Sequence, residues 1–450
     1  MKNRNAIRLF SFFLCICLCF FSIVACQKKE NKQQPEKTPE PPTTEESTTE
    51  ESTTESNTAG SEENNESETT TPSLGTDRMS SLKLGVILLH DERSPEDQNF
   101  IAAVERTKTK LKLADDQVIY KKNIAADASC IDAAEALVDE GCNIIFASSS
   151  WHEAILLLVA KRYPDVEFCL AAGNLAHTEN LANYHNAFAA IHTGKFLAGV
   201  AAGLKLTEMI ETGTITADEA KMGYIAAFPY PENVSAHTAF YLGAKYICPS
   251  ATMDVFFVDG QYESQKEELA AKVLILEGCV LISQDSVSLG GATTCEQEKV
   301  PFIASCENAV TAYPDSVIMS TSINWTPYFL YICNQFSQSE AIATDWTGTL
   351  VTDSIALSKI NTDVAAKETQ ELLDKIKAKL ISGEVQVFDT DTFTVNGMKL
   401  TSYEADVDAD DNYTPDTSVI FDGYFHESEF RSAPYFDIKI DGIDWINWFG

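Results

Sequence analysis

Positive charge is scarce in this sequence. Its 450 residues include 33 Lys and Arg against 67 Asp and Glu, which gives a formal net charge of -34 at pH 7. A surface with such an excess of acidic side chains repels the phosphate backbone of nucleic acids. We therefore expect no nucleic-acid partner. Hydrophobic residues make up 44% of the chain, which is enough for a sizeable buried core.

Motifs that carry catalysis or bind metals are also missing. The chain has no Cys pair with metal-ligand spacing and no GxSxG, HExxH or GxGxxG motif, and its seven His residues are scattered. The acidic run 406–410 lacks the Gly and Glu that complete a calcium loop. We expect no enzymatic activity, no catalytic residue, no metal and no cofactor. Most cysteines stand in apolar runs, so we assign no disulfide.

One long hydrophobic run, over residues 9–24, stands at the start of the chain after a basic segment. It is shorter than the ~20 residues of a membrane-spanning helix, and the pattern predicts a signal peptide over residues 1–26. Ala25 followed by Cys26 resembles the lipobox of bacterial lipoproteins. The resemblance implies lipid attachment at Cys26 through acyl chains of the palmitate type, on the extracellular face of the cell membrane. The alternative is an ordinary cleaved signal.

The segment that follows, residues 27–80, contains no aromatic residue. It consists almost entirely of Ser, Thr, Glu, Pro, Asn and Gln. Such a composition cannot bury enough apolar area to offset the entropy of ordering the chain, and its repeated negative charge extends it. We predict a disordered stalk between the lipid anchor and the folded part.

From Leu82 onward, short β-branched runs alternate with Ala-rich amphipathic segments. This order of strands and helices is typical of an α/β fold with a parallel sheet covered on both faces. The expected strands are 82–89, 118–120 and 143–147, and the expected helices are 96–113 and 129–140. Gly141 directly follows the second helix, as a helix-ending C′ glycine would.

An internal repeat runs through this α/β part. Three pairs of segments carry it, with a shared offset of ~137 residues. These are 84–87 with 222–225, 118–120 with 255–257, and 136–145 with 273–282. The offset is far longer than the 20–50 residues of a solenoid repeat, so it predicts two similar βαβ lobes.

We predict two lobes and a C-terminal segment. Lobe 1 comprises 82–188 and about 319–355, lobe 2 comprises 189–318, and 356–450 packs on the lobes with a helix over 364–380. Two such lobes form a cleft at the carboxyl ends of their strands, where open α/β sheets bind ligands. The expected strand-end loops are 90–100, 148–151, 171–175, 226–234, 259–263, 283–288 and 305–309.

Several segments of these lobes form a recognisable set. They include Lys195-Phe-Leu-Ala-Gly-Val-Ala-Ala-Gly-Leu204, Met222-Gly-Tyr-Ile-Ala-Ala-Phe-Pro-Tyr-Pro-Glu-Asn-Val234, and the segments 143–149, 163–168, 238–245, 248–252 and 320–329. Together they resemble the basic membrane protein family, the purine-nucleoside-receptor-like substrate-binding lipoproteins of ABC transporters. The resemblance covers about residues 82–355. It implies a two-lobed periplasmic-binding-protein type I fold with a hinge, a nucleoside or purine-base ligand, and an ABC permease as partner.

Some positions depart from that family's pattern. Where relatives carry an aromatic residue followed by Asp, this chain has Gln261-Tyr262-Glu263. Asn308 stands in the place of an Asp that would accept hydrogen bonds from ribose or base, and Thr238 replaces a common Asn. The implied fold does not depend on these positions, whereas the identity of the ligand does.

Candidate ligand contacts come from the strand-end loops. A purine needs flat apolar faces and a few fixed donors and acceptors. The aromatic candidates for stacking are Phe100, Trp151, Phe228, Tyr230 and Trp325. The polar candidates for base edges or ribose hydroxyls are Asn99, Ser149, Asn174, Gln261, Asp285 and Asn308. Each of these residues alone is also explained by core packing, helix capping or a turn.

The sequence therefore predicts a membrane-anchored extracellular solute-binding protein of an ABC importer, which closes its lobes on a nucleoside or purine-like small molecule. We expect a monomer with hinge strands near 186–190 and 317–322. Two alternatives keep the fold. One is a sensor that presents its ligand to a membrane receptor, and the other is a degenerate paralogue that acts as a surface adhesin.

Overall fold

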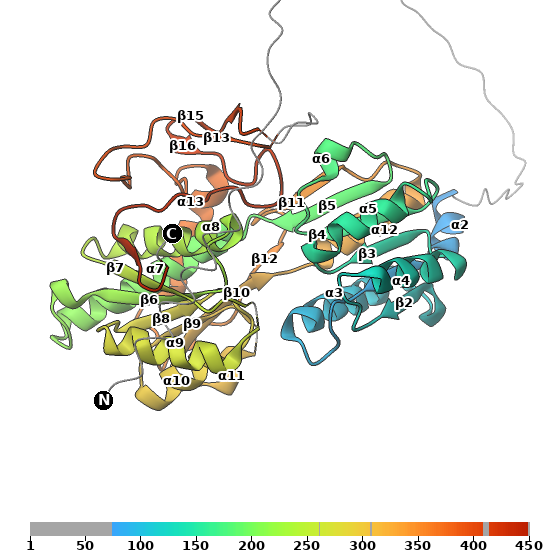
Figure 1. Cartoon of the computed structure of the whole chain (residues 1–450). Helices are drawn as coiled ribbons and strands as arrows, with labels where there is room; N and C mark the ends of the chain where they lie inside the picture. Colours follow the sequence, from blue (N-terminus) through green and yellow to red (C-terminus); the bar gives the residue numbers. More distant parts are fainter. Residues whose placement is uncertain (1–73, 261, 307, 408–413, 449–450) are drawn as a thin grey trace, which may run out of the picture. The chain divides into compact units, whose positions relative to one another are not determined.

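Two β-sheets with helices on both faces form the folded part of the chain (Figure 1). The computed structural model describes residues 74–448 except 261, 307 and 408–413. All of these residues belong to one unit, 70–450. The predicted signal peptide, Cys26 and most of the predicted stalk lie outside the described residues. Among the described helices, none has both the length and the apolar character needed to cross a membrane.

The first sheet has six parallel strands in the order β11-β5-β4-β3-β1-β2. They are β1 (Leu84–Ile87), β2 (Val118–Lys121), β3 (Ile144–Ala147), β4 (Glu167–Ala171), β5 (Tyr184–Ala189) and β11 (Asp345–Gly348). The helices of this lobe are α2 (Leu74–Ser81), α3 (Pro95–Leu111), α4 (Ala128–Asp139), α5 (Glu153–Ala160), α6 (Ala176–Glu179) and α12 (Thr326–Gln338). Alternate residues of β3 serve opposite faces: Ile144 and Phe146 pack with α3 and α12, whereas Ile145 packs with α4 and α5.

The second sheet follows the order β12-β10-β9-β8-β6-β7-β17. Its strands are β6 (Lys221–Ala226), β7 (Thr252–Phe257), β8 (Leu281–Gln284), β9 (Phe302–Ala304), β10 (Val317–Ile323), β12 (Ile355–Leu357) and β17 (Ile443–Trp445). Its helices are α7 (Ile191–Glu211), α8 (Pro231–Ile247), α9 (Ser264–Leu276), α10 (Gly290–Glu298), α11 (Ala309–Ala312) and α13 (Thr369–Ser382). β12 runs antiparallel to β10, whereas the other pairs are parallel.

The elements predicted around the first repeat are confirmed to within two residues at most bounds, because strand and helix periodicities differ clearly there. The duplication is confirmed as well. β1 lies between β2 and β3, as β6 lies between β7 and β8. The register agrees, since Leu84 faces Ile144 and Met222 faces Leu281.

A glycine at the same position of both central strands explains why the motif recurs. A side chain at Gly85 would come within 2.8 Å of Leu137 in α4, and one at Gly223 within 3.0 Å of Leu274 in α9. Glycine at both positions lets the helix pack this closely on the strand without displacing these leucine side chains. The repeated sequence therefore encodes helix-on-sheet packing, not a ligand contact.

One of the three repeat pairs is wrong by two residues. Val118 faces Leu84 on β1, but the residue that faces Met222 on β6 is Met253. The predicted partner, Val255, lies two positions further along β7. A shift of two residues keeps every side chain on its own face of the sheet, so the apolar pattern alone does not reveal it.

The chain passes between the sheets at three places: from β5 to α7, from β10 to α12, and from β11 to β12. The predicted boundary at about residue 319 lies inside β10, which pairs with β9 and β12 of the second sheet. The segment that belongs with the first sheet is 326–348, which forms α12 and β11. The repeat could not locate this return because 326–348 has no counterpart among the three repeated pairs.

The C-terminal segment packs mainly on the second lobe. Its helix α13 lies a few residues later than the predicted 364–380 and packs on α7. Beyond α13, stacked rings of Phe388 and Phe436, with centroids 4.3 Å apart, join the core of this lobe. The segment also contacts the first sheet, where the Ser432 backbone N–H donates to Asp345 Oδ2 of β11 at 3.1 Å. The final strand β17 extends the second sheet, which the sequence did not predict.

Candidate ligand-binding cleft

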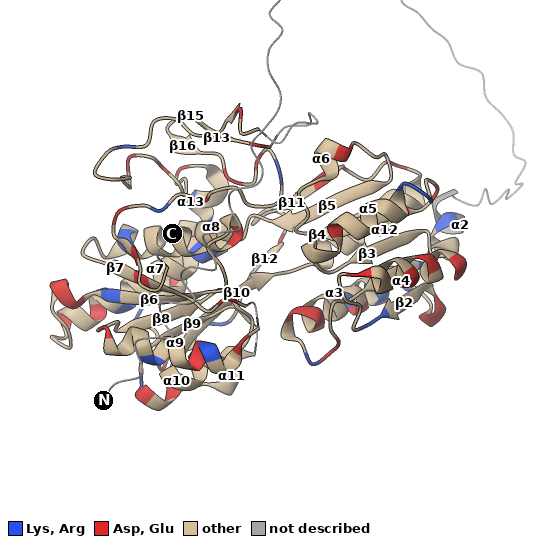
Figure 2. Cartoon of the chain, viewed as in Figure 1, with Lys and Arg blue, Asp and Glu red and all other residues tan. Residues whose placement is uncertain are grey.

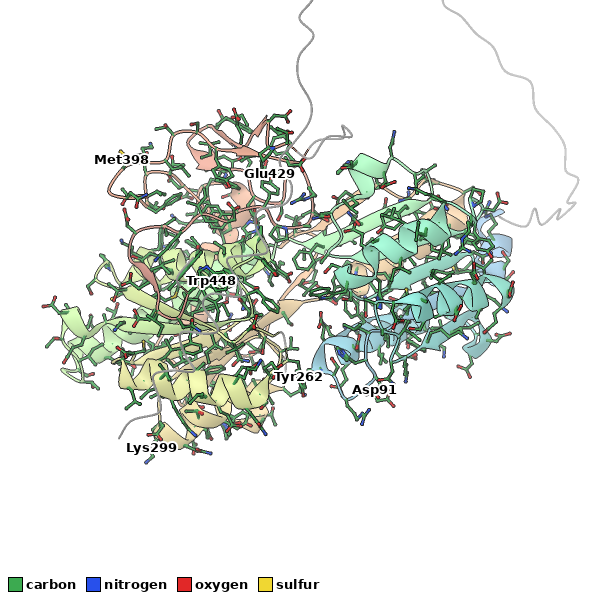
Figure 3. All side chains as sticks on the ribbon, in the orientation of Figure 1. Asp91, Tyr262, Lys299, Met398, Glu429 and Trp448 are labelled. Carbon is green, nitrogen blue, oxygen red and sulfur yellow. The ribbon has the colours of Figure 1, made fainter. Side chains whose placement is uncertain are left out.

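A cleft of about 290 Å³ lies between the carboxyl ends of the two sheets. Its lining comes from the loops after β1, β3 and β4 of the first sheet and after β6, β8 and β9 of the second. Six of the seven predicted loops contribute. The described residues of 259–263 do not, because β7 lies toward the outer edge of its sheet. Figure 3 labels Asp91 and Tyr262, which mark the loops after β1 and β7. Small-molecule sites usually enclose ~300–1,000 Å³, so the cleft suits a small solute.

The wall from the first sheet is aromatic. Trp325, directly before α12, is 4% exposed, and its ring centroid lies 4.8 Å from that of Phe100 and 6.4 Å from that of Phe188. Phe146 of β3 backs this pair, with its centroid 5.4 Å from that of Phe100. The rings fix one another by packing. The cleft therefore has a preorganised apolar surface on this side.

A second tryptophan on the same wall is exposed. Trp151 stands in a short 3-10 helix, η2 (Ser150–His152), where its backbone N–H donates to Ser149 Oγ at 3.3 Å. Trp151 lines the cleft and is 60% exposed. Large aromatic side chains are usually well buried on average. Packing within the chain does not explain this ring, whereas a solute lying in the cleft would cover it.

Hydrogen bonds fix the loops of the first wall. Asn99 Nδ2 donates to Ile323 O at 2.7 Å, which ties α3 to the end of β10. Buried Asp97 accepts from the His90 backbone N–H at 2.8 Å and from Ser148 Oγ at 3.1 Å. Burial raises the pKa of Asp97, and these hydrogen bonds oppose the rise. Asn99 thus lines the cleft, and its Nδ2 already donates a hydrogen bond within the protein.

The wall from the second sheet is ionic. Lys195, in the second turn of α7, is 4% exposed, and its Nζ donates to Gln284 O at 3.0 Å and to Ser305 Oγ at 2.7 Å. The same Nζ lies 3.9 Å from Asp285 Oδ1. Burial lowers the pKa of Lys195, and Asp285 opposes that shift. The sequence-based site missed Lys195. A signal existed, because a Lys directly before the apolar run 196–204 is rarely left in the core without a partner.

Two buried oxygen atoms on this side, Asp285 Oδ2 and Thr321 Oγ1, form no hydrogen bond with the described residues. Tyr224 Oη donates to Asp285 Oδ1 at 2.5 Å, while Asp285 Oδ2 makes no hydrogen bond with the described residues. Burial raises the pKa of Asp285 to about 6, against the lowering effects of Lys195, Tyr224 and the nearby Asn233 side chain. Thr321 of β10 is 1% exposed, and its Oγ1 likewise has no partner among the described residues. Both residues line the cleft.

Two further carboxylates line the cleft, and the sequence-based site missed them both. Glu96 and Glu232 are the second residues of α3 and α8, each directly after a proline. Glu96 is exposed, and the neighbouring protein atoms, together with Glu232 and Asp97, raise the pKa of its carboxyl. Desolvation and Asp285 raise the pKa of Glu232 to about 7. The repeated Pro-Glu pair, Pro95-Glu96 and Pro231-Glu232, was the available signal.

Three of the predicted site residues lie away from the cleft lining. Phe228 and Tyr230 stack on each other, with centroids 5.2 Å apart, and the nearby Ala227 and Glu232 line the cleft instead. Asn174 lines a separate small cavity with Arg431, and its backbone N–H donates to Glu153 Oε1 at 2.8 Å.

The remaining predicted residues come together. The cleft lining includes Asn99, Phe100, Ser149, Trp151, Asp285, Asn308 and Trp325. Asn308 directly precedes α11. Gln261 lies outside the described residues. The eight cysteines of the described part are buried and form no disulfide with one another, and one of them, Cys306, also lines the cleft.

Curated relatives share part of this chain. It is 26% identical over 214 residues to the purine-binding protein of Brucella abortus, covering 48% of this chain and 57% of that protein. It is 34% identical over 146 residues to a putative ABC transporter glucose-binding protein of Haloferax volcanii, covering 32% of this chain and 34% of that protein. The matches thus span 57% and 34% of the length of these two relatives.

A solved structure shares the fold. The ABC transporter solute-binding protein of Conexibacter woesei superposes with a TM-score of 0.54 at 20% identity, covering 68% of this chain and 98% of that one. The fold is therefore α/β and periplasmic-binding-protein-like, as predicted. The model of the Bmp family, described as ABC transporter substrate-binding protein PnrA-like, matches residues 93–391, more than half of the chain. This chain belongs to the PnrA-like family of ABC transporter substrate-binding proteins, a family of solute-binding proteins.

Proposed function

We propose that this protein is the membrane-anchored extracellular solute-binding component of an ABC importer, and that its cleft takes a nucleoside or a purine-like molecule. The observation that carries the proposal is the cleft itself. It joins a fixed aromatic surface on one sheet to unfilled hydrogen-bonding positions on the other, Asp285 Oδ2 and Thr321 Oγ1. A flat heterocycle with polar edges matches that combination.

Three features support a purine-like solute. Trp325 and Phe100 offer an apolar face, and exposed Trp151 stands at the same wall. Asn308 and Ser149 line the cleft and have side chains that both donate and accept hydrogen bonds. The curated relative from Brucella abortus is named a purine-binding protein.

Attachment to the membrane is proposed from the sequence. The Ala25-Cys26 pair after the apolar run would place a lipid on Cys26, and the acidic stalk would connect that anchor to the lobes. In this arrangement the solute is captured outside the cell and passed to a permease. The replacement Cys26→Ala should leave the protein in the culture medium, whereas continued labelling of the membrane fraction with palmitate would contradict the anchor.

Capture would require the lobes to move relative to each other. We assign the hinge to the crossing strands near 186–190 and 317–322, together with the connection from β11 to β12. Closing the lobes would bring the aromatic wall and the ionic wall onto opposite sides of one solute.

Thermal unfolding tests the proposed ligand class. Protein expressed from residue 27 onward is melted with purine nucleosides, purine bases and hexoses, because a ligand that binds only the native state raises the melting temperature. We expect adenosine, guanosine or a related purine to raise it and hexoses to leave it unchanged. A shift with hexoses alone would contradict the purine assignment. Uptake of the labelled solute by cells with and without the gene then separates import from ligand sensing.

A further inference from the structure

The cleft has more acidic side chains than basic ones to pair with them. Among its described lining residues, four are formally charged: Glu96, Glu232, Asp285 and Lys195. Lys195 and Asp285 lie 3.9 Å apart and largely neutralise each other. Neither glutamate forms an ion pair or a side-chain hydrogen bond with the described residues. Two carboxylates are therefore left without a counter-charge in a site that binds a small molecule.

The two glutamates face the same space from opposite lobes. Glu96 begins α3 of the first lobe, Glu232 begins α8 of the second, and both line the cleft. Desolvation raises the pKa of Glu96, and the charge of Glu232 adds to that rise. Acidic residues, red in Figure 2, are common on both lobes. The repulsion between Glu96 and Glu232 grows as the lobes close, unless something positive lies between them.

Aromatic rings stand beside these carboxylates. Trp325 and Phe100 form the fixed surface of the first wall, and Trp151 is exposed at the same wall. The faces of aromatic rings attract cations, Trp most strongly. Thr321 Oγ1, buried and without a partner among the described residues, is a separate sign that a ligand completes the site.

We propose that the solute is a cation: a purine-like or related nitrogen heterocycle with an alkylated or protonated ring nitrogen, whose ring lies on the Trp325 wall and whose charge lies between Glu96 and Glu232. This inference rests on the proposed function and names the solute class more narrowly. A cation supplies the missing counter-charge to both carboxylates. Carboxylates combined with aromatic faces also reject anionic nucleotides, because phosphate would meet two like charges.

The alternative is a neutral solute, for which the two glutamates must take up protons as the lobes close. The two cases differ in the sign of their pH dependence. Ionised Glu96 and Glu232 attract a cation, so its affinity rises with pH, whereas affinity for a neutral solute that requires protonated glutamates falls. The other ionisable groups facing these two carboxyls are Asp97 and Asp285, with Lys195 behind Asp285.

Two isomeric nucleosides provide the test. 1-Methyladenosine is a cation at neutral pH, whereas N6-methyladenosine has the same composition and is neutral. Calorimetric titration of the full-length protein should give at least about tenfold tighter binding of the cation at pH 7.5, a difference that should narrow at pH 6.0 as the glutamates take up protons. Equal binding, or a preference for the neutral isomer, overturns the charge assignment.

Binding of unmodified adenosine distinguishes a failure of the charge assignment from a failure of the proposed function. If adenosine or N6-methyladenosine binds and 1-methyladenosine does not, the charge assignment fails and the proposed function stands. If all three nucleosides fail to bind, the proposed function fails, and the charge assignment that rests on it fails too.

Substitutions locate the effect. Glu96→Gln and Glu232→Gln should each weaken binding of 1-methyladenosine about fivefold to tenfold and change binding of N6-methyladenosine less than about twofold. Glu298→Gln is the matched control, because Glu298 is exposed at the end of α10 and does not line the cleft. Equal losses for both isomers in the cleft variants would contradict the proposal. Melting temperatures without ligand show whether each variant folds.

Discussion

The two walls of the cleft share a scaffold but differ in chemistry. In the first lobe, Trp325, Phe100 and Phe188 form an aromatic surface. In the second lobe, buried Lys195 and Asp285 form an ionic one. Both walls are built on the ends of strands that pair in the same order and register. The duplicated framework therefore fixes where the loops emerge, while the side chains on those loops diverge to contact different parts of one solute.

The difference between the lobes is clear at one position, the third residue of α3 and of α8, whose side chain accepts a backbone hydrogen bond in both lobes. In the first lobe, Asp97 of α3 accepts from the His90 backbone N–H and from Ser148 after β3. In the second lobe, the Phe228 backbone N–H donates to the equivalent residue of α8, Asn233. Burial raises the pKa of Asp285, which follows β8, and the Asn233 side chain lessens that rise.

The acid and its neutral partner are exchanged between the lobes. Asp97 on the helix corresponds to Asn233, and Ser148 after the strand corresponds to Asp285. The carboxylate is turned inward to the frame in the first lobe and placed at the cleft in the second. One exchange of side chains thus decides which lobe presents charge to the solute.

Removing the aromatic wall should have the largest effect. Trp325→Ala deletes a buried ring that packs on Phe100 and Phe188, and we expect a loss of about 3–5 kcal/mol in the free energy of unfolding because of the cavity left behind. Urea unfolding monitored by circular dichroism measures it. Exposed Trp448, replaced by Ala, is the control and should change stability by less than about 1 kcal/mol. A similar loss in both variants would show that Trp325 has no special place in the wall.

Breaking the ionic wall should cost about 3 kcal/mol at pH 7.5. Lys195→Met leaves Asp285 buried without its cation, and the uncompensated charge destabilises the fold. The sign with pH follows from the raised pKa of Asp285. The Asp285 carboxyl binds its proton more tightly in the folded protein than in the unfolded chain. Its contribution to the free energy of unfolding is therefore lost as pH rises from about 4 through about 6.

The defect of Lys195→Met should therefore shrink at pH 5, where Asp285 is protonated. Unfolding curves at pH 5 and pH 7.5 check this, with the exposed Lys272→Met on α9 as the control. A defect of the same size at both pH values would mean that Lys195 acts through packing alone.

The exposed ring of the first wall should affect binding and not folding. Trp151→Ala removes a residue that is 60% exposed, so the melting temperature should stay within about 1 °C. If a solute covers this ring, affinity for it should fall about tenfold, or about 1.4 kcal/mol. Calorimetric titration measures the change. Unchanged affinity would remove Trp151 from the site.

The first lobe should tolerate an asparagine at position 97, the residue type that the second lobe has at Asn233. Asp97→Asn gives the first lobe the residue that the second has at Asn233, and the amide can still accept from His90 and meet Ser148. We expect a loss below about 1 kcal/mol, against about 1–3 kcal/mol for Asp97→Ala, which leaves the His90 N–H without its partner. Equal losses would show that the charge of Asp97 matters more than its hydrogen bonds.

Much of this arrangement could be predicted because it is local. The alternation of periods predicted β1, α3, α4 and β3, and Gly141, with φ of 84°, ends its helix as expected. The rule that ligands meet the carboxyl ends of parallel strands predicted seven loops, and six of them line the cleft. Within those loops, aromatic residues were predictable as a class but not one by one. Phe100 and Trp325 line the cleft, whereas Phe228 and Tyr230 stack on each other beside it.

The sequence by itself determined the α/β order, the duplication and the end of the sheets where the cleft opens, because apolar periodicity and helix-ending glycines act over a few residues. Only the tertiary structure decided the ionic wall. Lys195 donates to Gln284 and Ser305, which are 89 and 110 residues away in the chain, and Glu96 and Glu232 line one cleft from different lobes. The partners of a buried charge depend on which distant segments come together in the fold, and a local sequence pattern does not show this.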